Sequence, residues 1–257
     1  MVFYFTATGN CLYVAKNLDC APVSIAQEQL GKTYRADVIG VVSPIFAHDL
    51  PKNVAEFLRR ATFETEYFFL VLTYGFRHGG AMIRAEKLLR DSGKRVDYIN
   101  TLLMVDNALP AFDIAEELKL DKKTDENLAA IKRDISARRT FIQQPDKVNL
   151  DFHEIFLKAP FKMDPEKDFR AKGLDMYKIS PECVGCGVCS KVCPKACFKI
   201  ADGKAQHDMT DCIACLACIH ACKRRAIQFT FPEKNPNVRY RNPHVKLSEI
   251  ITANNRH

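Results

Sequence analysis

The sequence predicts an α/β protein: a doubly wound parallel sheet, then a helical connector, then a small α+β domain rich in cysteine. Three observations support this class. Apolar runs alternate with amphipathic stretches over the first 111 residues, the 257-residue chain contains 11 cysteines, and nine of these lie between Cys183 and Cys222. An apolar fraction of 47% and a charged fraction of 27% are those of a globular protein, which excludes fibrous and disordered classes.

Apolar runs without polar alternation predict buried strands in the first region. The strands are expected at Val2–Thr6, Ala36–Ser43, Tyr67–Thr73 and Val96–Val105. The helices between them are expected at Asn10–Leu18, Pro51–Arg60 and Ala81–Arg90. Such an alternation predicts a parallel sheet covered on both faces, and ligands of these sheets bind beyond the carboxyl ends of the strands.

The pattern changes after residue 111, where the first domain (1–111) is expected to end. One helix is predicted over Asp125–Phe141, and the segment 112–175 is interpreted as a helical connector. The cysteine-rich domain is expected at 176–231 and a basic, solvated tail at 232–257.

No membrane partner is expected, because the longest apolar run, Tyr67–Leu72, is far shorter than the roughly 20 residues that span a bilayer. A strand-like run directly after Met1 leaves no room for a signal peptide, so a cytoplasmic protein is predicted. In a reducing cytoplasm, crowded cysteines favour metal ligation over disulfides.

Two cysteine runs share one spacing. The first is Cys183-x₂-Cys186-x₂-Cys189-x₃-Cys193-Pro194, and the second is Cys212-x₂-Cys215-x₂-Cys218-x₃-Cys222. The small residues between the ligands, Gly185, Gly187, Ala214 and Ala217, would let backbone amides approach the sulfurs. A pair of zinc sites is the alternative, but zinc sites rarely need a third cysteine at the same gap. Cys11, Cys20 and Cys197 fall outside the pattern, and Cys197 is interpreted as a small buried residue.

This spacing resembles that of bacterial two-[4Fe–4S] ferredoxins, in which the fourth cysteine of each run ligates the other cluster. The resemblance implies one cluster on Cys183, Cys186, Cys189 and Cys222, and the other on Cys212, Cys215, Cys218 and Cys193. Lys223 departs from the pattern, because it stands where the first run has Pro194.

The net charge of +7 arises at the cysteine-rich end, where residues 176–257 carry 13 Lys and Arg against 6 Asp and Glu. Two oxidised clusters with four thiolates each would contribute about −2 apiece, so the basic residues partly balance them. No nucleic-acid partner is expected, because no recognition motif accompanies the charge.

A second set of motifs follows the predicted strands. The loop Phe5-Thr6-Ala7-Thr8-Gly9-Asn10-Cys11 offers short hydroxyls, a glycine and backbone amides to a phosphate at a helix N-terminus. Phe46 and Tyr74 lie on the loops after the next two strands, as is needed to sandwich a flat ring; packing at the rim is the alternative. The candidate cofactor-binding residues are Thr6, Ala7, Thr8, Gly9, Asn10, Cys11, Ser43, Pro44, Ile45, Phe46, Thr73, Tyr74, Gly75, Phe76 and Gly79.

Here the sequence resembles flavodoxin, and the order of the loops more closely resembles the fused flavodoxin–ferredoxin proteins of anaerobic bacteria and archaea. The resemblance implies one FMN, with Thr6, Thr8, Gly9 and Asn10 at its phosphate and Phe46 and Tyr74 near its ring. Two residues depart from the family: Cys11 replaces the usual hydroxyl residue, and Ala7 stands where many relatives have glycine.

The combined motifs predict an electron-transfer protein that passes electrons between two low-potential [4Fe–4S] clusters and FMN, and exchanges them with redox protein partners, acidic ones suiting the basic tail. No catalytic residue is assigned. Two alternatives stay open: a ferredoxin-driven, FMN-dependent reductase of a small substrate, with His48 and His78 as proton donors, and a redox-sensing interaction protein. Whether flavin and clusters meet within one chain or across a homodimer also stays open.

Overall fold

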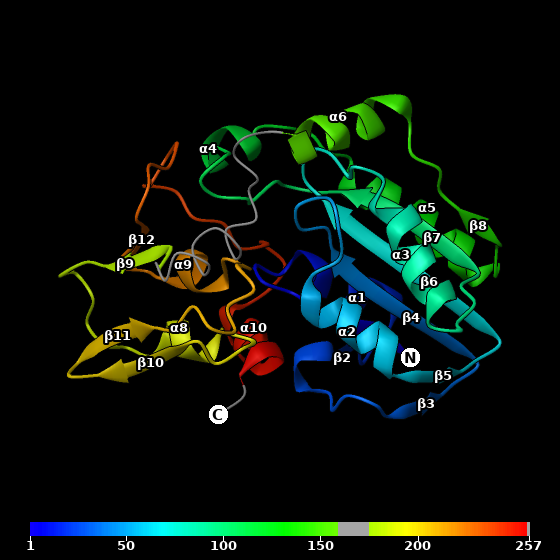
Figure 1. Cartoon of the computed structure of the whole chain (residues 1–257), viewed down its shortest axis with the longest axis horizontal. Helices are drawn as coiled ribbons and strands as arrows, with labels where there is room; N and C mark the ends of the chain where they lie inside the picture. The colour runs from blue at the N-terminus through cyan, green and yellow to red at the C-terminus, as the bar shows by residue number, and fades with distance from the viewer. Residues whose placement is uncertain (159–174, 256–257) are drawn as a thin grey trace. The chain divides into compact units, whose positions relative to one another are not determined.

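The protein is described by a computed structural model that covers residues 1–158 and 175–255 (Figure 1). The chain forms two compact units. The sheet unit contains Met1–Thr6, Asn10–Val105 and 121–158, and the cysteine-rich unit contains Ala7–Gly9, Asp106–Leu120 and 175–255. The segment interpreted as a connector, 112–175, therefore contributes residues to both units. No helix among the described residues has the length and apolar character needed to cross a membrane.

The sheet unit is built on a six-stranded parallel sheet with the order β2-β1-β4-β6-β7-β8. These strands are β1 (Val2–Tyr4), β2 (Val23–Ser24), β4 (Val38–Pro44), β6 (Tyr67–Tyr74), β7 (Tyr98–Leu103) and β8 (Phe141–Ile142). Two short strands, β3 (Thr33–Arg35) and β5 (Thr62–Glu64), pair separately. Without β8 the order is that of the flavodoxin-like doubly wound fold, and it reverses between β1 and β4.

Helices cover both faces of this sheet (Figure 1). They are α1 (Asn10–Leu18), α2 (Lys52–Arg60), α3 (Ala81–Asp91) and α5 (Thr124–Ser136), with the 3₁₀ turn η1 (Ile25–Gln27). Helix α6 (Lys147–Lys158) does not pack on a face of the sheet, and Asn149 is its one buried residue. Helix α1 contacts α5, and α2 contacts α3. The central strands β4 and β6 are buried along almost their whole length, which confirms the prediction drawn from their unbroken apolar runs.

The predicted helix over Asp125–Phe141 was wrong at its end. Helix α5 ends at Ser136, and Phe141 begins strand β8 at the edge of the sheet. Arg138 takes a left-handed conformation with φ of +50°, which an α-helix cannot continue through. Phe141 therefore belongs to the sheet and not to the helix.

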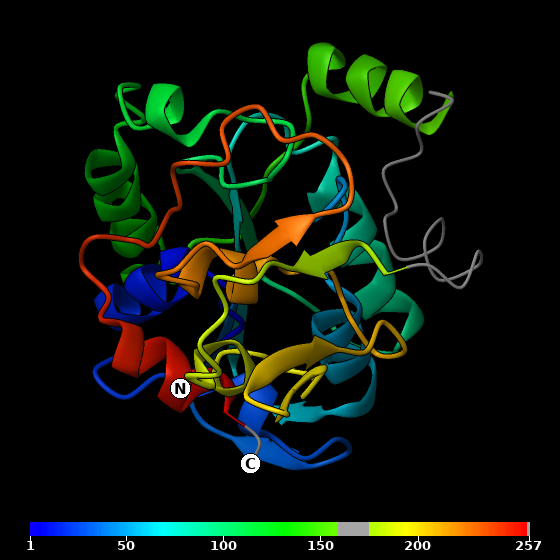
Figure 2. The ribbon, with the colours of Figure 1, turned by 90° about the vertical axis from the view of Figure 1, so that its left-hand side faces the viewer.

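The cysteine-rich unit is small and α+β, as predicted. Its strands form two antiparallel pairs: β9 (Tyr177–Ile179) with β12 (Ile227–Phe229), and β10 (Phe198–Ala201) with β11 (Lys204–His207). Figure 2 looks onto this unit and shows β9 beside β12. Its helices are α4 (Ile114–Glu117), α8 (Val188–Lys191), α9 (Ala217–Ala221) and α10 (Leu247–Asn254).

The segment 232–257 was predicted to be a solvated tail, but much of its described part is packed. Tyr240, Val245, Ile250 and Ala253 are buried, and the buried Asn254 donates from Nδ2 to the Val192 carbonyl at 3.2 Å. Alternating polar and apolar residues concealed this packing in the sequence.

Replacing Gly40 in β4 with alanine is expected to destabilise the sheet unit. A Cβ atom at Gly40 would lie 2.0 Å from Cζ of Phe69, whose ring packs over the glycine. Overpacking of this kind costs about 1–3 kcal/mol. Because both changes act on one contact, the loss in Gly40→Ala/Phe69→Leu should be smaller than the sum of the single losses. Urea denaturation measures both quantities, and a neutral Gly40→Ala would contradict the packing.

Candidate metal centres and cofactor loops

The two cysteine runs adopt the same local backbone. Left-handed residues lie two and four positions after the first cysteine of each run: Gly185 and Gly187 in the first, Ala214 and Leu216 in the second. Leu216, with φ of +65°, thus takes the role that the sequence suggested for Ala217. The left-handed residues turn the chain around the sulfurs, so the conformation recurs in the second run even though glycine does not.

Backbone amides donate to the sulfurs of both runs. The amides of Cys197 and Ala226 lie four residues after Cys193 and Cys222 and donate to their Sγ atoms at 3.2 and 3.3 Å. The Ala214 amide donates to Cys212 Sγ at 3.4 Å. Such bonds favour the thiolate form and, in iron–sulfur proteins, help to set the reduction potential.

One predicted set of ligands lines a single cavity in the cysteine-rich unit. Its sulfur-bearing members include Cys193 of the first run together with Cys212, Cys215 and Cys218 of the second. Tyr177 and Phe198 close the cavity with aromatic rings. Cys197, His207 and Lys195 line the same cavity. The thiols of Cys193, Cys212, Cys215 and Cys218 are a donor set that fits a [4Fe–4S] cluster, and Cys193 comes from the other run, as the resemblance implies.

The other predicted set interacts electrostatically. Burial, opposed by a hydrogen bond from the Ser190 amide, raises the pKa of the Cys189 thiol to about 11. Repulsion from the charges of Cys186, Cys222 and Cys183 raises this pKa further. Cys222, which is far away in sequence, therefore acts on Cys189 together with the two cysteines of the first run.

A mononuclear site makes a different demand on spacing. Four thiolates around one zinc ion lie about 3.8 Å apart, whereas a [4Fe–4S] cube presents a separate iron to each thiolate. Within residues 1–158 and 175–255, no three His, Cys, Asp or Glu side chains form a group that could hold a single metal ion. The sulfur atoms of a zinc site therefore lie closer together than those that bind a [4Fe–4S] cluster.

Cys197 is buried, as predicted, and occupies the position that Ala226 takes in the second run. Both residues donate their amide to the fourth cysteine of their run. The size of the side chain, small at both positions, is what this turn requires.

In the sheet unit, the loops after β4 and β6 contact each other directly. The Ile45 amide, just after β4, donates to the carbonyl of Thr73 in β6 at 2.8 Å, and Phe46 and Asp49 exchange two backbone hydrogen bonds within the loop after β4. Gly79 has no room for a side chain, because a Cβ atom there would lie 2.4 Å from Cγ of His48. Phe46 and Tyr74, predicted to flank a flat ring, are both partly exposed on these loops.

The residues that follow β1 were predicted to surround a phosphate. In the sheet unit, Thr6 and Asn10 are buried, and Cys11 Sγ lies 3.2 Å from Thr73 Oγ1. Two of the predicted cofactor contacts, Cys11 and Thr73, therefore hydrogen bond to one another. Burial raises the pKa of Cys11 to about 12, so its thiol stays protonated at neutral pH.

The remaining loop residues, Ala7, Thr8 and Gly9, pack within the cysteine-rich unit. Thr8 Oγ1 accepts a hydrogen bond from Asn107 Nδ2 at 2.7 Å, and the Thr8 carbonyl accepts from the Asn242 amide at 2.8 Å. Gly9 has φ of +104°, and a Cβ atom there would lie 3.0 Å from Cβ of Asn242. Only glycine suits this position without strain.

Helix α6 contacts the loops after β4 and β6, although no sequence motif indicated it. Asn149 Oδ1 accepts hydrogen bonds from the His78 and Gly79 amides at 3.0 and 3.4 Å. The ring of Phe152 lies 5.7 Å from that of Phe76. Helix α6 lies within the predicted helical connector, 112–175, but no pattern in the sequence linked it to these loops.

His48 and His78 are both buried, whereas loop histidines are usually exposed. His48 Nδ1 lies 3.2 Å from His153 Nδ1 of α6. Burial lowers the pKa of His48 to about 4, and the positive charges of His153 and Arg84 add to this effect. Burial also lowers the pKa of His78. Both imidazoles are therefore uncharged at neutral pH.

Comparisons with known proteins support the second unit. Residues 159–242 match the family model described as a 4Fe-4S dicluster domain. Over 58 residues the chain is 37% identical to a subunit of the ion-translocating oxidoreductase complex of Methanosarcina acetivorans, an alignment that covers 22% of each protein. Over 54 residues it is 43% identical to the formate dehydrogenase iron-sulfur subunit of Wolinella succinogenes, covering 20% of this chain and 27% of that one. The chain thus spans about a quarter of these relatives.

Among solved structures, the metal-soaked Flv1 flavodiiron core from Synechocystis sp. PCC6803 aligns with 52% of this chain and 36% of its own. The identity is 14% and the TM-score 0.26, a similarity too low to support an argument about this protein. The family match and the two relatives instead identify the C-terminal part as an iron–sulfur, electron-transfer domain.

Replacement of one predicted ligand is expected to remove one cluster only. Cys222→Ser should lower the iron content from about eight to about four per chain, because it removes a thiolate from one set. Cys197→Ala should retain about eight irons, since Ala226 shows that alanine suits this turn. Iron and acid-labile sulfide analysis measures both, with Cys20→Ala, at an exposed position, as the control. Loss of iron in Cys197→Ala, or none in Cys222→Ser, would contradict the ligand sets.

The stability of the sheet unit is expected to fall as the pH falls from about 6.5 towards 4. Unfolded His48 accepts a proton below its ordinary pKa of 6.5, whereas the folded residue resists protonation down to about 4. The free energy of unfolding therefore decreases as the pH falls from about 6.5 to 4, and protonation of His48 does not change it above that range. His48→Asn should lose less stability than the unaltered protein between pH 7 and 5 in urea denaturation, with His244→Asn, an exposed site, as the control. If the free energy of unfolding depends on pH equally in all three proteins, His48 is not the group responsible.

Proposed function

We propose that this protein passes electrons between two low-potential [4Fe–4S] clusters and one FMN. The observation that carries the proposal is the gathering of Cys193 with Cys212, Cys215 and Cys218 around one cavity. Ligands crossed between the two runs would account for this gathering, and crossed ligands are the property of two-cluster ferredoxins. Cys222, with Cys183, Cys186 and Cys189, would hold the other cluster.

The sheet unit supports the flavin part of the proposal through its topology. The strand order reverses between β1 and β4, the place where flavodoxin-like folds bind their ligand. The loops after β4 and β6 meet where His48 packs against Gly79. Phe46 lies on the first loop, and Tyr74 is the last residue of β6. The chemistry of the residues after β1, which are two threonine hydroxyls, a glycine and amides at the start of α1, suits a phosphate monoester.

Each group of residues has a distinct role in this proposal. The eight cysteines hold the clusters, and the amides of Cys197 and Ala226 stabilise negative charge on their sulfurs. Thr6, Thr8 and Asn10 would bind the FMN phosphate, while Phe46 and Tyr74 would flank the ring. A bound FMN supplies the conversion between one-electron and two-electron transfer.

A reductase of a small substrate is less well supported. Its proton donors would be His48 and His78, but burial keeps both imidazoles uncharged at neutral pH, and a general acid needs a pKa near the working pH. The relay requires no such group. A redox sensor would be distinguished by complex formation that depends on the oxidation state without turnover.

A redox protein is the partner that this function requires. The two similar proteins are named as subunits of an oxidoreductase complex and of a formate dehydrogenase, so each works beside other subunits. We infer that the present chain likewise exchanges electrons with a protein donor or acceptor. A reducing compartment such as the cytoplasm would keep its cysteines available for iron.

Reductive titration tests the relay. Anaerobic protein is expected to take up about four electron equivalents per chain, one for each cluster and two for FMN, with loss of the flavin absorbance. In Cys222→Ser the uptake should fall by about one. Uptake of two equivalents with no flavin signal, even after FMN is added, would contradict the flavin half and leave the ferredoxin half.

The hydroxyl of Thr8 is expected to contribute to FMN affinity. Because Oγ1 accepts from Asn107, its own hydrogen remains available to donate to a phosphate oxygen. A hydrogen bond to a charged group contributes about 1.5–3 kcal/mol, so Thr8→Val should weaken FMN binding roughly 10-fold to 100-fold. Flavin fluorescence quenching measures the affinity. Riboflavin, which lacks the phosphate, should bind both proteins equally, and Thr8→Ser should restore FMN binding; equal losses for both flavins would contradict the role.

A further inference from the structure

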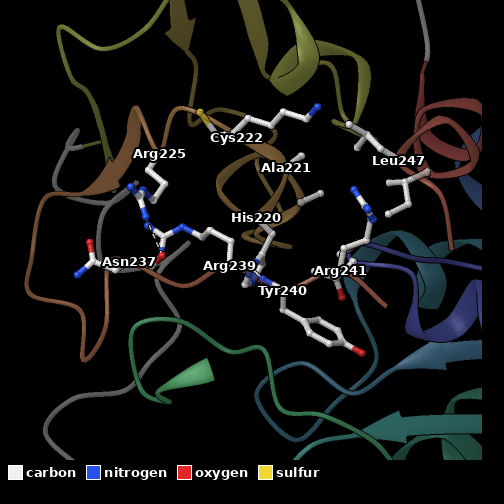
Figure 3. A pocket seen from close by; sticks show the side chains of 14 residues that line it. His220, Ala221, Cys222, Arg225, Asn237, Arg239, Tyr240, Arg241 and Leu247 are labelled. Atoms are coloured by element: carbon white, nitrogen blue, oxygen red, sulfur yellow. Dashed lines mark hydrogen bonds between the residues drawn. The ribbon is translucent and has the colours of Figure 1, made fainter. Parts of the chain in front are cut away.

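A second cavity in the cysteine-rich unit is strongly basic. It has a volume of about 370 Å³, and its lining includes Lys223, Arg225, Arg239 and Arg241 (Figure 3). Two of these cations directly follow the cysteine run, and the other two precede α10. Within the described residues, no aspartate or glutamate lines the cavity.

Only one of the four charges is neutralised by a neighbour. Arg239 forms an ion pair with Glu233 at 2.9 Å, and both side chains are buried. Its Nε is also buried and has no hydrogen-bond partner among the described residues. Arg225 donates to the Asn237 carbonyl, which leaves its charge uncompensated. The part of the chain that the structure describes contains no carboxylate paired with Lys223, Arg225 or Arg241.

A neutral histidine positions the arginines. His220 Nδ1 accepts from the Tyr240 amide at 3.0 Å, so Nε2 carries the hydrogen and donates to the Asn107 carbonyl at 2.9 Å. The bond fixes the backbone between Arg239 and Arg241, which holds both side chains at the cavity.

The symmetry of the unit argues that these cations do more than balance a cluster. Lys223 and Arg225 occupy the positions that Pro194 and Ala196 have in the first run. Arg225 even adopts φ of +52°, a conformation that favours glycine, just as Ala196 does. If Lys223 and Arg225 only balanced the charge of a cluster, the first run would need cations at the same two positions. It has Pro194 and Ala196 there.

We propose that this cavity binds a phosphate monoester. Arginine and lysine side chains from two segments line the cavity, and their charge and donor groups match a phosphate. A volume of about 370 Å³ accommodates a phosphorylated small molecule, and Tyr240 and Leu247 offer apolar surface to its remainder. Thr8 also lines the cavity, so the phosphate is either that of FMN or that of a separate compound.

The affinity of the cavity for phosphate would depend on the oxidation state of the cluster that Cys222 is proposed to bind. This consequence rests on the proposed cluster ligands. Cys222 lines the same cavity, so a bound phosphate would lie beside a cluster ligand. Reduction adds a negative charge to the cluster and repels the phosphate. By thermodynamic linkage, bound phosphate would lower the reduction potential of that cluster by an amount set by the ratio of its affinities for the oxidised and the reduced protein.

Calorimetric titration of the cluster-containing protein with AMP and with inorganic phosphate tests the site. Arg241→Gln and Lys223→Gln should each weaken binding roughly tenfold or more, because each removes a charge-assisted contact. Arg224→Gln is the matched control: Arg224 is the next residue in sequence but pairs with Glu182 and lies outside the cavity lining. Its affinity should be unchanged. Equal iron content in all variants shows that each has folded.

The same titrations on flavin-free and FMN-loaded protein identify the source of the phosphate. Competition between AMP and FMN would assign the cavity to the flavin phosphate, and independent binding would assign it to a separate compound; both support the site. Absence of binding would overturn it, as would equal weakening in Arg224→Gln, which would indicate general attraction between charges. Tight binding of an acidic protein without binding of either phosphate probe would also overturn it. Failure of FMN binding alone leaves the cavity untouched.

Discussion

In the proposed ligand sets, the exchange of the fourth cysteine between the two runs is the constraint on which the cysteine-rich unit depends. Cys193 leaves its own run to join Cys212, Cys215 and Cys218, and Cys222 acts electrostatically on Cys189 of the first run. Under this proposal, neither run supplies a complete ligand set alone. The repeated left-handed turns and amide–sulfur bonds follow from this constraint, because each fourth cysteine must be aimed away from its neighbours in sequence.

In the sheet unit, the order of the strands reverses between β1 and β4, and the proposed FMN site lies at the carboxyl ends of these strands. Close contacts fix the loops at this edge. The ring of His48 packs against Gly79, and Asn149 of α6 accepts hydrogen bonds from the His78 and Gly79 amides. Burial then keeps His48 and His78 neutral, which suits a site that moves electrons and leaves protons to solvent. The basic cavity beside Cys222 adds a place where an anion could act on electron transfer.

Much of this could be predicted from the sequence, because the strongest signals are local. Unbroken apolar runs identified β4 and β6, and cysteine spacing identified the second unit, which the family match confirms. Features that depend on distant contacts could not be predicted. The end of α5 depends on the backbone of Arg138, the role of α6 depends on Asn149, and the packed segment before α10 depends on His220, none of which has a periodic pattern.

The cofactor content of anaerobically purified protein tests the central claim most directly. Iron, acid-labile sulfide, zinc and released flavin are measured against protein concentration. About eight irons, about eight sulfides and one FMN per chain are predicted. Zinc in place of iron would contradict the electron-transfer account, because zinc carries no redox chemistry.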